Sequence, residues 1–82
     1  MSYTDDKLKQ IWGKARKVRG KDPDTYRKDC EGNVMYRHSY GKCSQMGWEV
    51  DHSKPKAKGG TDHLNNLQPL HWNANRKKGC DY

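Results

Sequence analysis

The sequence is poor in apolar residues. It contains no phenylalanine, and only 30% of its 82 residues are hydrophobic. No apolar run is long enough for a membrane helix or a signal peptide, so we expect a soluble protein, cytoplasmic in a bacterium or in a phage-infected cell. A single domain of this length buries only about 60–65% of its unfolded surface, so a metal ion, a disulfide or a partner commonly adds stability.

Cysteine is also scarce. Cys30, Cys43 and Cys80 are the three in the chain, and none forms a C-x-x-C pair. This spacing favours neither a zinc ribbon nor a disulfide framework. In a reducing compartment we expect three thiols with small, buried or half-buried side chains.

Acidic residues are outnumbered by basic ones. Seventeen lysines and arginines stand against ten acids, which gives a net charge of +7. Such an excess favours a polyanionic partner, with nucleic acid ahead of an anionic membrane surface. Charge alone is equally compatible with a solvated basic surface.

Residues 4–19, TDDKLKQIWGKARKVR, predict a basic amphipathic helix. Thr4 can cap it, and Asp5 and Asp6 suit the positive end of the helix dipole. One apolar stripe at helical spacing follows, and it consists of Leu8, Ile11, Trp12, Ala15 and Val18. We expect this stripe to pack on the core, and the basic side is a candidate for phosphate contacts.

The rest of the chain predicts short elements. Residues 26–46 form a lead-in segment with a turn signal at 31–33, and residues 34–36 begin either a strand or a short helix. Residues 47–52 predict a strand that ends at His52, and residues 67–70 a short strand limited by Pro69. A basic helix then covers 71–78, with Gly79 just beyond it. Trp48 and Trp72 are expected in the core.

Asp51 and His52 stand side by side where the first of these strands ends. An imidazole exchanges protons near neutral pH, and a carboxylate binds hard cations. In a regular strand the two side chains leave on opposite faces. On the last helix, His71, Asn75 and Lys78 share a face, which lines either a site or the solvent.

The stretch GWEVDHSKPKAKGGTDHLNNLQPLHWNANRKKG, residues 47–79, resembles the HNH endonucleases. The family pattern is a strand ending in Asp-His, a loop with Pro and Gly-Gly, an Asn-Leu-x-x-Leu segment, and a helix with Asn and then Lys-Gly. The matching positions are Asp51-His52, Pro55, Gly59-Gly60, Asn66-Leu67 with Leu70, and Asn75 with Lys78-Gly79. Residues 26–46 resemble the lead-in of small phage and bacterial members more weakly, and the first twenty residues show no usable resemblance.

The resemblance implies an α+β fold: a ββα-metal (His-Me finger) core at 47–79 with an added N-terminal helix, in a single domain spanning 1–82. It implies that His52 is the general base that activates water. Asp51 and Asn75 would hold one catalytic divalent ion. Asn66 is expected to tie down the long loop and to help orient His52.

The metal itself is not fixed by the sequence. A carboxylate and an amide oxygen suit Mg²⁺ or Mn²⁺, whereas a neutral imidazole would admit Zn²⁺, Ni²⁺ or Co²⁺. His71 is an extra ligand, a phosphate contact or a packing residue, and we favour the last two together. Many relatives bind a structural zinc through two C-x-x-C pairs, but His71 and Ala74 replace the second pair here, so we expect no structural zinc.

The implied activity is hydrolysis of DNA, by nicking or double-strand cleavage, with little sequence preference. A homodimer or a partner protein would supply double-strand cutting or specificity, and packaging, restriction and toxin roles are all compatible. The alternative is a non-catalytic, metal-stabilised nucleic-acid-binding module, which needs no base at position 52. The expected DNA contacts are Lys54, Lys56, Lys58, Arg37, Arg76 and Lys78.

Overall fold

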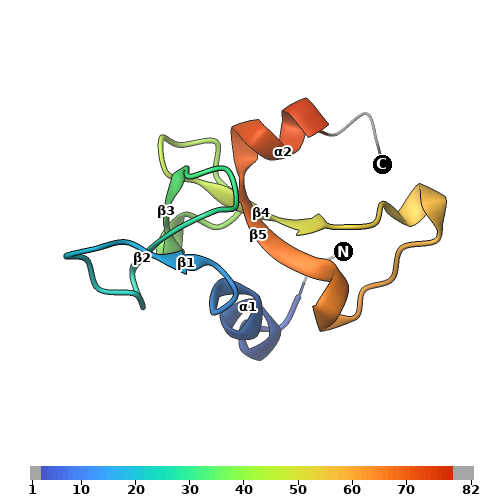
Figure 1. Cartoon of the computed structure of the whole chain (residues 1–82), viewed down its shortest axis with the longest axis horizontal. Helices are drawn as coiled ribbons and strands as arrows, with labels where there is room; N and C mark the ends of the chain where they lie inside the picture. The colour runs from blue at the N-terminus through green and yellow to red at the C-terminus, as the bar shows by residue number, and fades with distance from the viewer. Residues whose placement is uncertain (1–2, 79–82) are drawn as a thin grey trace.

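The computed structural model describes residues 3–78, which form an α+β fold with two antiparallel sheets (Figure 1). A three-stranded sheet has the order β1-β2-β3, and β4 pairs with β5 in a separate hairpin. The elements in chain order are α1 (Asp5–Trp12), β1 (Arg16–Lys17), β2 (Tyr26–Lys28), β3 (Val34–Tyr36), β4 (Trp48–His52), β5 (Leu67–His71) and α2 (Trp72–Lys78).

α1 is shorter than the sequence predicts. The expected cap is present, since the Thr4 hydroxyl oxygen accepts a hydrogen bond from the Lys7 amide at 3.2 Å. The helix ends at Trp12, and Gly13 caps it, so the prediction of helix over 4–19 is wrong beyond this point. The helix ends at Trp12 for two reasons. Gly13 has a low helix propensity, and residues 16–17 pair with β2.

The lead-in segment folds as a hairpin. The turn predicted at 31–33 is present, and Gly32 has a φ of +87°, which favours glycine. Residues 34–36 form a strand, which resolves the choice left open by the sequence. Buried Asp29 fixes this hairpin to the rest of the molecule, because its carboxylate accepts hydrogen bonds from the Asn33 and His71 backbone amides.

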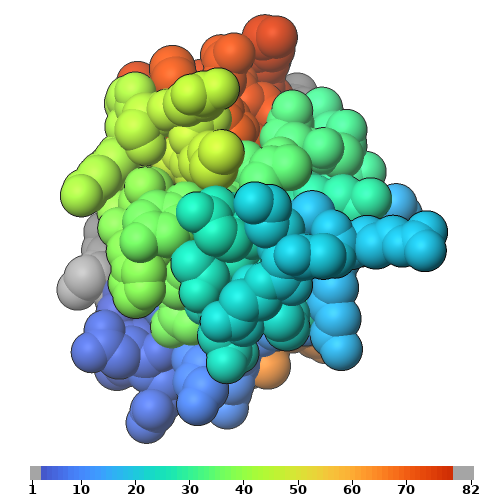
Figure 2. All heavy atoms as spheres, turned by 90° about the vertical axis from the view of Figure 1, so that its left-hand side faces the viewer, coloured from blue at the N-terminus to red at the C-terminus, as the bar shows by residue number. Residues whose placement is uncertain are grey.

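The β4–β5 hairpin is the centre of the molecule. Its register pairs Trp48 with His71, Asp51 with Gln68 and His52 with Leu67. α1 lies below this hairpin in Figure 1 and α2 lies above it, so the hairpin is sandwiched between the two helices. Figure 2 shows the side of the molecule that lies on the left in Figure 1. There the segment from β1 to the start of β4 forms the surface between α1 and α2.

Two tryptophans, Trp12 and Trp48, lie in the buried core together with aliphatic side chains and Met35. Trp48 is fully buried and packs against Trp12 and Tyr40, with ring centroids 5.1 and 4.9 Å away. Met35 closes this cluster. Trp72, which was also expected in the core, is only half-buried and donates its indole N–H to the Ser44 carbonyl at 2.5 Å.

Two further expectations concern the surface. Cys30 and Cys43 are free thiols but exposed, so the prediction of buried or half-buried cysteines is wrong for both; Cys80 and Gly79 lie outside the described residues. Cys30 lies in the turn between β2 and β3, and Cys43 lies in the connection before β4. Neither helix of the described part is long and apolar enough to cross a membrane.

Candidate active site

The end of β4 sends its side chains in two directions. Asp51 contacts α2 through Lys78, whereas His52 contacts Asp62, which is itself held by α1. This is the opposite-face arrangement that strand geometry predicts for adjacent residues. The Asp51 carboxylate and the His52 imidazole therefore lie on opposite faces of the end of β4.

Asp51 is completely buried and is bound by a cation. The Lys78 ammonium lies 3.0 and 2.8 Å from its two carboxylate oxygens, and it also reaches the His52 carbonyl at 3.2 Å. The Gln68 amide, directly across the hairpin, donates to Asp51 Oδ2 at 2.8 Å. A buried carboxylate requires such compensation, because an unpaired charge away from water is strongly unfavourable.

Asn75 lies on the same side of the hairpin. Its side-chain N–H donates to Glu49 Oε1 at 2.9 Å, and Arg76 approaches the other Glu49 oxygen at 3.7 Å. Glu49 and Asp51 are two residues apart on β4 and so share a face. α2 therefore crosses this face with Asn75 at Glu49 and Lys78 at Asp51, and the bond to Glu49 fixes which end of the Asn75 amide is nitrogen.

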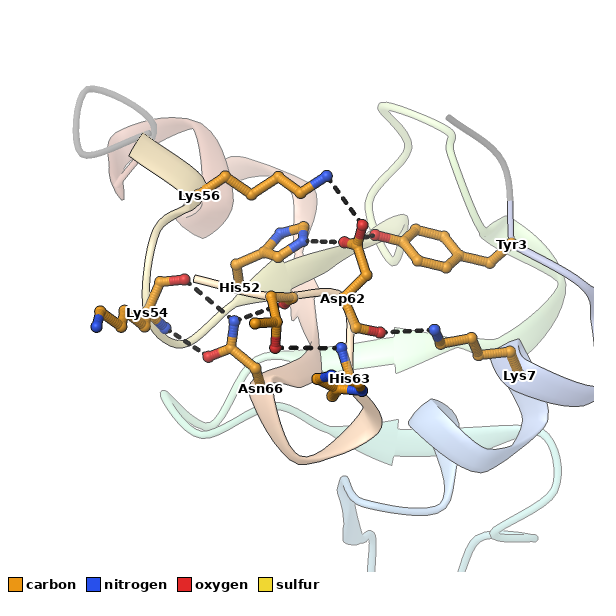
Figure 3. A network of polar contacts seen from close by, with 9 residues as sticks. Tyr3, Lys7, His52, Lys54, Lys56, Asp62, His63 and Asn66 are labelled. Atoms are coloured by element: carbon orange, nitrogen blue, oxygen red, sulfur yellow. Dashed lines mark hydrogen bonds and ion pairs between the residues drawn. The ribbon is translucent and has the colours of Figure 1, made fainter. Parts of the chain in front are cut away.

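His52 is nearly buried on the other side, and its Nε2 lies 2.6 Å from Asp62 Oδ1 (Figure 3). Lys56 approaches Asp62 Oδ2 at 2.9 Å. The hydrogen bond with His52, followed by that with Lys56, lowers the pKa of Asp62 from 3.8 to about 2. Asp62 was missed by the sequence reasoning, and its one signal was an acid two positions after the Gly59-Gly60 pair.

Asn66 holds the long loop between β4 and β5. Its amide oxygen accepts from the Lys54 backbone N–H at 2.8 Å, and its amide N–H groups reach the carbonyls of Lys54 and Thr61 at 3.1 and 2.8 Å. The Asn66 carbonyl accepts from the Ser53 amide at 2.9 Å. One side chain thus joins both sides of the loop immediately after His52.

A comparison with protein-family models finds the HNH endonuclease family over residues 30–81, more than half of the chain. The chain belongs to the HNH endonuclease family. No curated protein and no solved structure matches it significantly. Membership identifies a nuclease acting on nucleic acid, and it accounts for the β4–β5–α2 arrangement as the ββα core that the resemblance implied. The match begins at residue 30, so it includes part of the lead-in hairpin.

His71 is one HNH-core residue whose role the sequence left open. Its Nε2 lies 2.7 Å from the Gln45 carbonyl, and its Nδ1 accepts from the Asn73 amide at 3.2 Å. Its ring also stacks on Trp72 with centroids 5.9 Å apart. Both ring nitrogens are thus engaged by the protein, which favours the packing role over metal coordination.

The six expected DNA contacts do not form one group. Lys54, Lys56 and Lys58 are exposed on the loop after β4, whereas Arg37 lies 6.0 Å from the Trp12 ring at the core. Arg76 is exposed on α2, and Lys78 is bound to Asp51. The six residues therefore lie on three segments: the loop after β4, α2, and the short helical turn that carries Arg37.

Donors for a metal ion are few. Within residues 3–78, no three His, Cys, Asp or Glu side chains are grouped to hold a metal. The family's ion would therefore depend on the Asp51 carboxylate and the Asn75 amide oxygen, with water completing its coordination. The donor chemistry fits, because both groups offer oxygen to a hard cation and the Asp51 carboxylate already binds a cationic group.

Proposed function

We propose that this HNH protein is a metal-dependent DNA endonuclease of low sequence specificity, in which His52 takes the proton from the attacking water and Asp51 and Asn75 hold one divalent ion. The observation that carries the proposal is the divided end of β4: a buried, cation-binding carboxylate on one face and a carboxylate-bound imidazole on the other. A structural strand end needs neither feature.

Asp51 and Asn75 suit Mg²⁺ or Mn²⁺, since both offer oxygen to a hard cation. Zn²⁺, Ni²⁺ and Co²⁺ are less suited, because both nitrogens of His71 are engaged elsewhere. When bound, the ion would offset the negative charge that grows on the phosphate and on the leaving 3′ oxygen. Cleavage would leave 5′-phosphate and 3′-hydroxyl ends.

His52 supplies the other half of the reaction. Its imidazole is held by Asp62 from one side, and the loop that follows it is closed by Asn66. A restrained base of this kind costs little reorganisation when a proton moves to it. Asn66 therefore acts on the geometry of the loop.

DNA binding would be mainly electrostatic. Lys54 and Lys58 are exposed on the loop next to His52, and Arg76 is exposed on α2. Contacts of this kind with phosphates carry no sequence information. Among residues 3–78, the remaining elements are short strands and a two-turn helix, and none is long enough to read a groove beyond the site. A second copy or a partner protein would therefore supply specificity.

The rival function is a binding module that holds nucleic acid without cutting it. Such a module needs phosphate contacts, but it needs no imidazole restrained by a carboxylate at the strand end. The 2.6 Å contact between His52 and Asp62 therefore favours the nuclease.

Asp51→Ala and Asn75→Ala test the proposed ion site. Both should weaken Mn²⁺ binding by at least about 10- to 100-fold by calorimetry and reduce plasmid nicking in parallel, because even the loss of a partner that only orients a metal ligand costs about that much. Lys77→Ala on the exposed side of α2 is the control. Unchanged Mn²⁺ affinity in both variants would exclude the proposed ligands.

A further inference from the structure

Asp62 is the hub of a network that joins His52 to the N-terminal helix. Its carboxylate contacts His52 Nε2 at 2.6 Å and Lys56 Nζ at 2.9 Å (Figure 3). The Lys7 ammonium from α1 donates to the Asp62 carbonyl at 2.6 Å, and the Tyr3 hydroxyl lies 3.5 Å from Oδ1. Burial and the nearby Asp62 charge raise the pKa of Tyr3, so its hydroxyl keeps its proton.

The contact with Asp62 defines the protonation of the imidazole. An ionised carboxylate only accepts hydrogen bonds, so His52 Nε2 must carry the proton that lies between them. In a neutral imidazole the basic nitrogen is then Nδ1. When Nδ1 also takes up a proton, the ring becomes an imidazolium, and the same carboxylate stabilises its positive charge.

We propose that Asp62 is a positioning residue of the nuclease, which fixes the Nε2–H tautomer and the ring orientation of His52 so that Nδ1 receives the proton from water. The proposal rests on the function proposed above. In the step, an O–H bond of water breaks and its proton moves to Nδ1. The hydroxide oxygen forms a bond to phosphorus while the bond between phosphorus and the 3′ oxygen breaks, and the 3′ oxygen leaves with the electron pair and takes a proton from solvent.

The loop is built to bring Asp62 back to His52. Gly59 has a φ of +89°, and a Cβ on Gly60 would lie 1.8 Å from the Lys54 carbonyl oxygen. Both positions therefore require glycine for the chain to reverse tightly after the lysines. Ten residues after His52, this reversal returns an acid to the imidazole.

α1 supports this loop from outside. The Lys7 ammonium, on α1, binds the Asp62 carbonyl. Lys14 lies just after the end of α1, and its ammonium donates to the Leu64 carbonyl at 2.7 Å and to the Leu67 carbonyl. The sequence had offered the basic side of this helix for phosphate contacts. These two lysines instead hold the segment that carries Asp62 and Asn66.

The experiment compares the wild type with Asp62→Asn, Asp62→Glu and the control Asp24→Asn, which makes the same charge change at an exposed turn residue. We expect Asp62→Asn to lower the single-turnover nicking rate about 100-fold at saturating protein, because a misplaced reacting group costs about that much. DNA affinity should match that of Asp24→Asn. Asp62→Glu should restore part of the rate, because it keeps the acceptor charge.

The tautomer of His52 is measured separately, by the nitrogen chemical shifts of the imidazole in the metal-free protein. The wild type should be predominantly Nε2–H, and Asp62→Asn should show both tautomers because a carboxamide both donates and accepts. This measurement on the wild type needs no variant, so it decides the proposal even if Asp62→Asn does not fold.

Two results would overturn the inference while the proposed function stands: an active wild type with predominantly Nδ1–H His52, or Asp62→Asn nicking as fast as Asp24→Asn. A wild type that nicks with no divalent ion overturns the proposed function itself, and the positioning role of Asp62 falls with it.

Discussion

Lys78 of α2 places its ammonium on both carboxylate oxygens of Asp51, at 3.0 and 2.8 Å. The carboxylate is fully buried, while the lysine side chain is 28% exposed. This pair joins the helix to the strand end that carries His52. An ion that binds at Asp51 would therefore share the carboxylate with the Lys78 ammonium or displace that ammonium.

Lys78→Met should destabilise the metal-free protein and tighten metal binding. Removing one partner of a buried ion pair costs about 3–5 kcal/mol, and we expect about 2–3 kcal/mol here because Lys78 is partly exposed. Adding Mn²⁺ should then raise the melting temperature more in Lys78→Met than in the wild type. Melting curves with EDTA and with Mn²⁺ measure both effects.

Lys77→Met is the matched control, since it removes an exposed charge from the same helix turn. An equal Mn²⁺ effect in wild type, Lys78→Met and Lys77→Met would show that the ion does not compete with Lys78 for Asp51.

Asp29→Ala should be among the most destabilising single changes. The buried carboxylate accepts from the backbone amides of Glu31, Asn33 and His71 and from the Asn33 side chain. Losing it leaves partly buried donors without acceptors, at a cost of about 2–4 kcal/mol. Urea unfolding measures the loss, and Asp24→Ala at an exposed turn serves as control. A loss no larger than that of the control would refute the role of Asp29 as the link between the two sheets.

Asp62 should contribute to stability in a defined pH window. Its pKa is lowered from 3.8 to about 2 in the folded chain, first by His52 and then by Lys56. A lowered acid pKa favours the folded state above pH about 4, and this contribution disappears as the pH falls to about 2. The difference in melting temperature between wild type and Asp62→Asn should therefore shrink over that window. A difference independent of pH would contradict the ion pair.

The loop lysines should set the salt dependence of DNA binding. Lys54→Gln and Lys58→Gln should each reduce the slope of log affinity against log salt by about 0.9, if each contacts one phosphate. Lys17→Gln on β1 makes the same charge change on another element and should leave the slope nearly unaltered. Fluorescence anisotropy with labelled duplex measures all three. Equal salt slopes in all variants would show that the loop does not contact the DNA.

The sequence predicted the elements whose signals are local. The strand ending at His52, the turn at 31–33 and the capped start of α1 all follow from residue types at short spacing. The end of α1 did not, because Ala15 and Val18 continue the helical stripe while tertiary pairing of residues 16–17 with β2 overrides it. A pattern of apolar residues cannot show which non-local strand competes for the backbone.

The candidate site follows from the sequence only in part, for the same reason. The spacing of the family motif locates Asp51, His52, Asn66 and Asn75, but partners of these groups come from elsewhere in the chain. Asp62 reaches His52 only because the loop reverses at Gly59-Gly60, and Glu49 reaches Asn75 only through the crossing of α2 over β4. Lys78 was expected on phosphate, yet it compensates the buried Asp51 charge.

The most direct measurement is a supercoiled-plasmid assay with a panel of divalent ions, in which the wild type is run beside His52→Ala and DNA affinity is measured for both. The account predicts nicking by the wild type with Mg²⁺ or Mn²⁺, its loss with EDTA, and no nicking by His52→Ala at nearly unchanged affinity. Nicking by His52→Ala at the wild-type rate would contradict the assignment of His52 as the base.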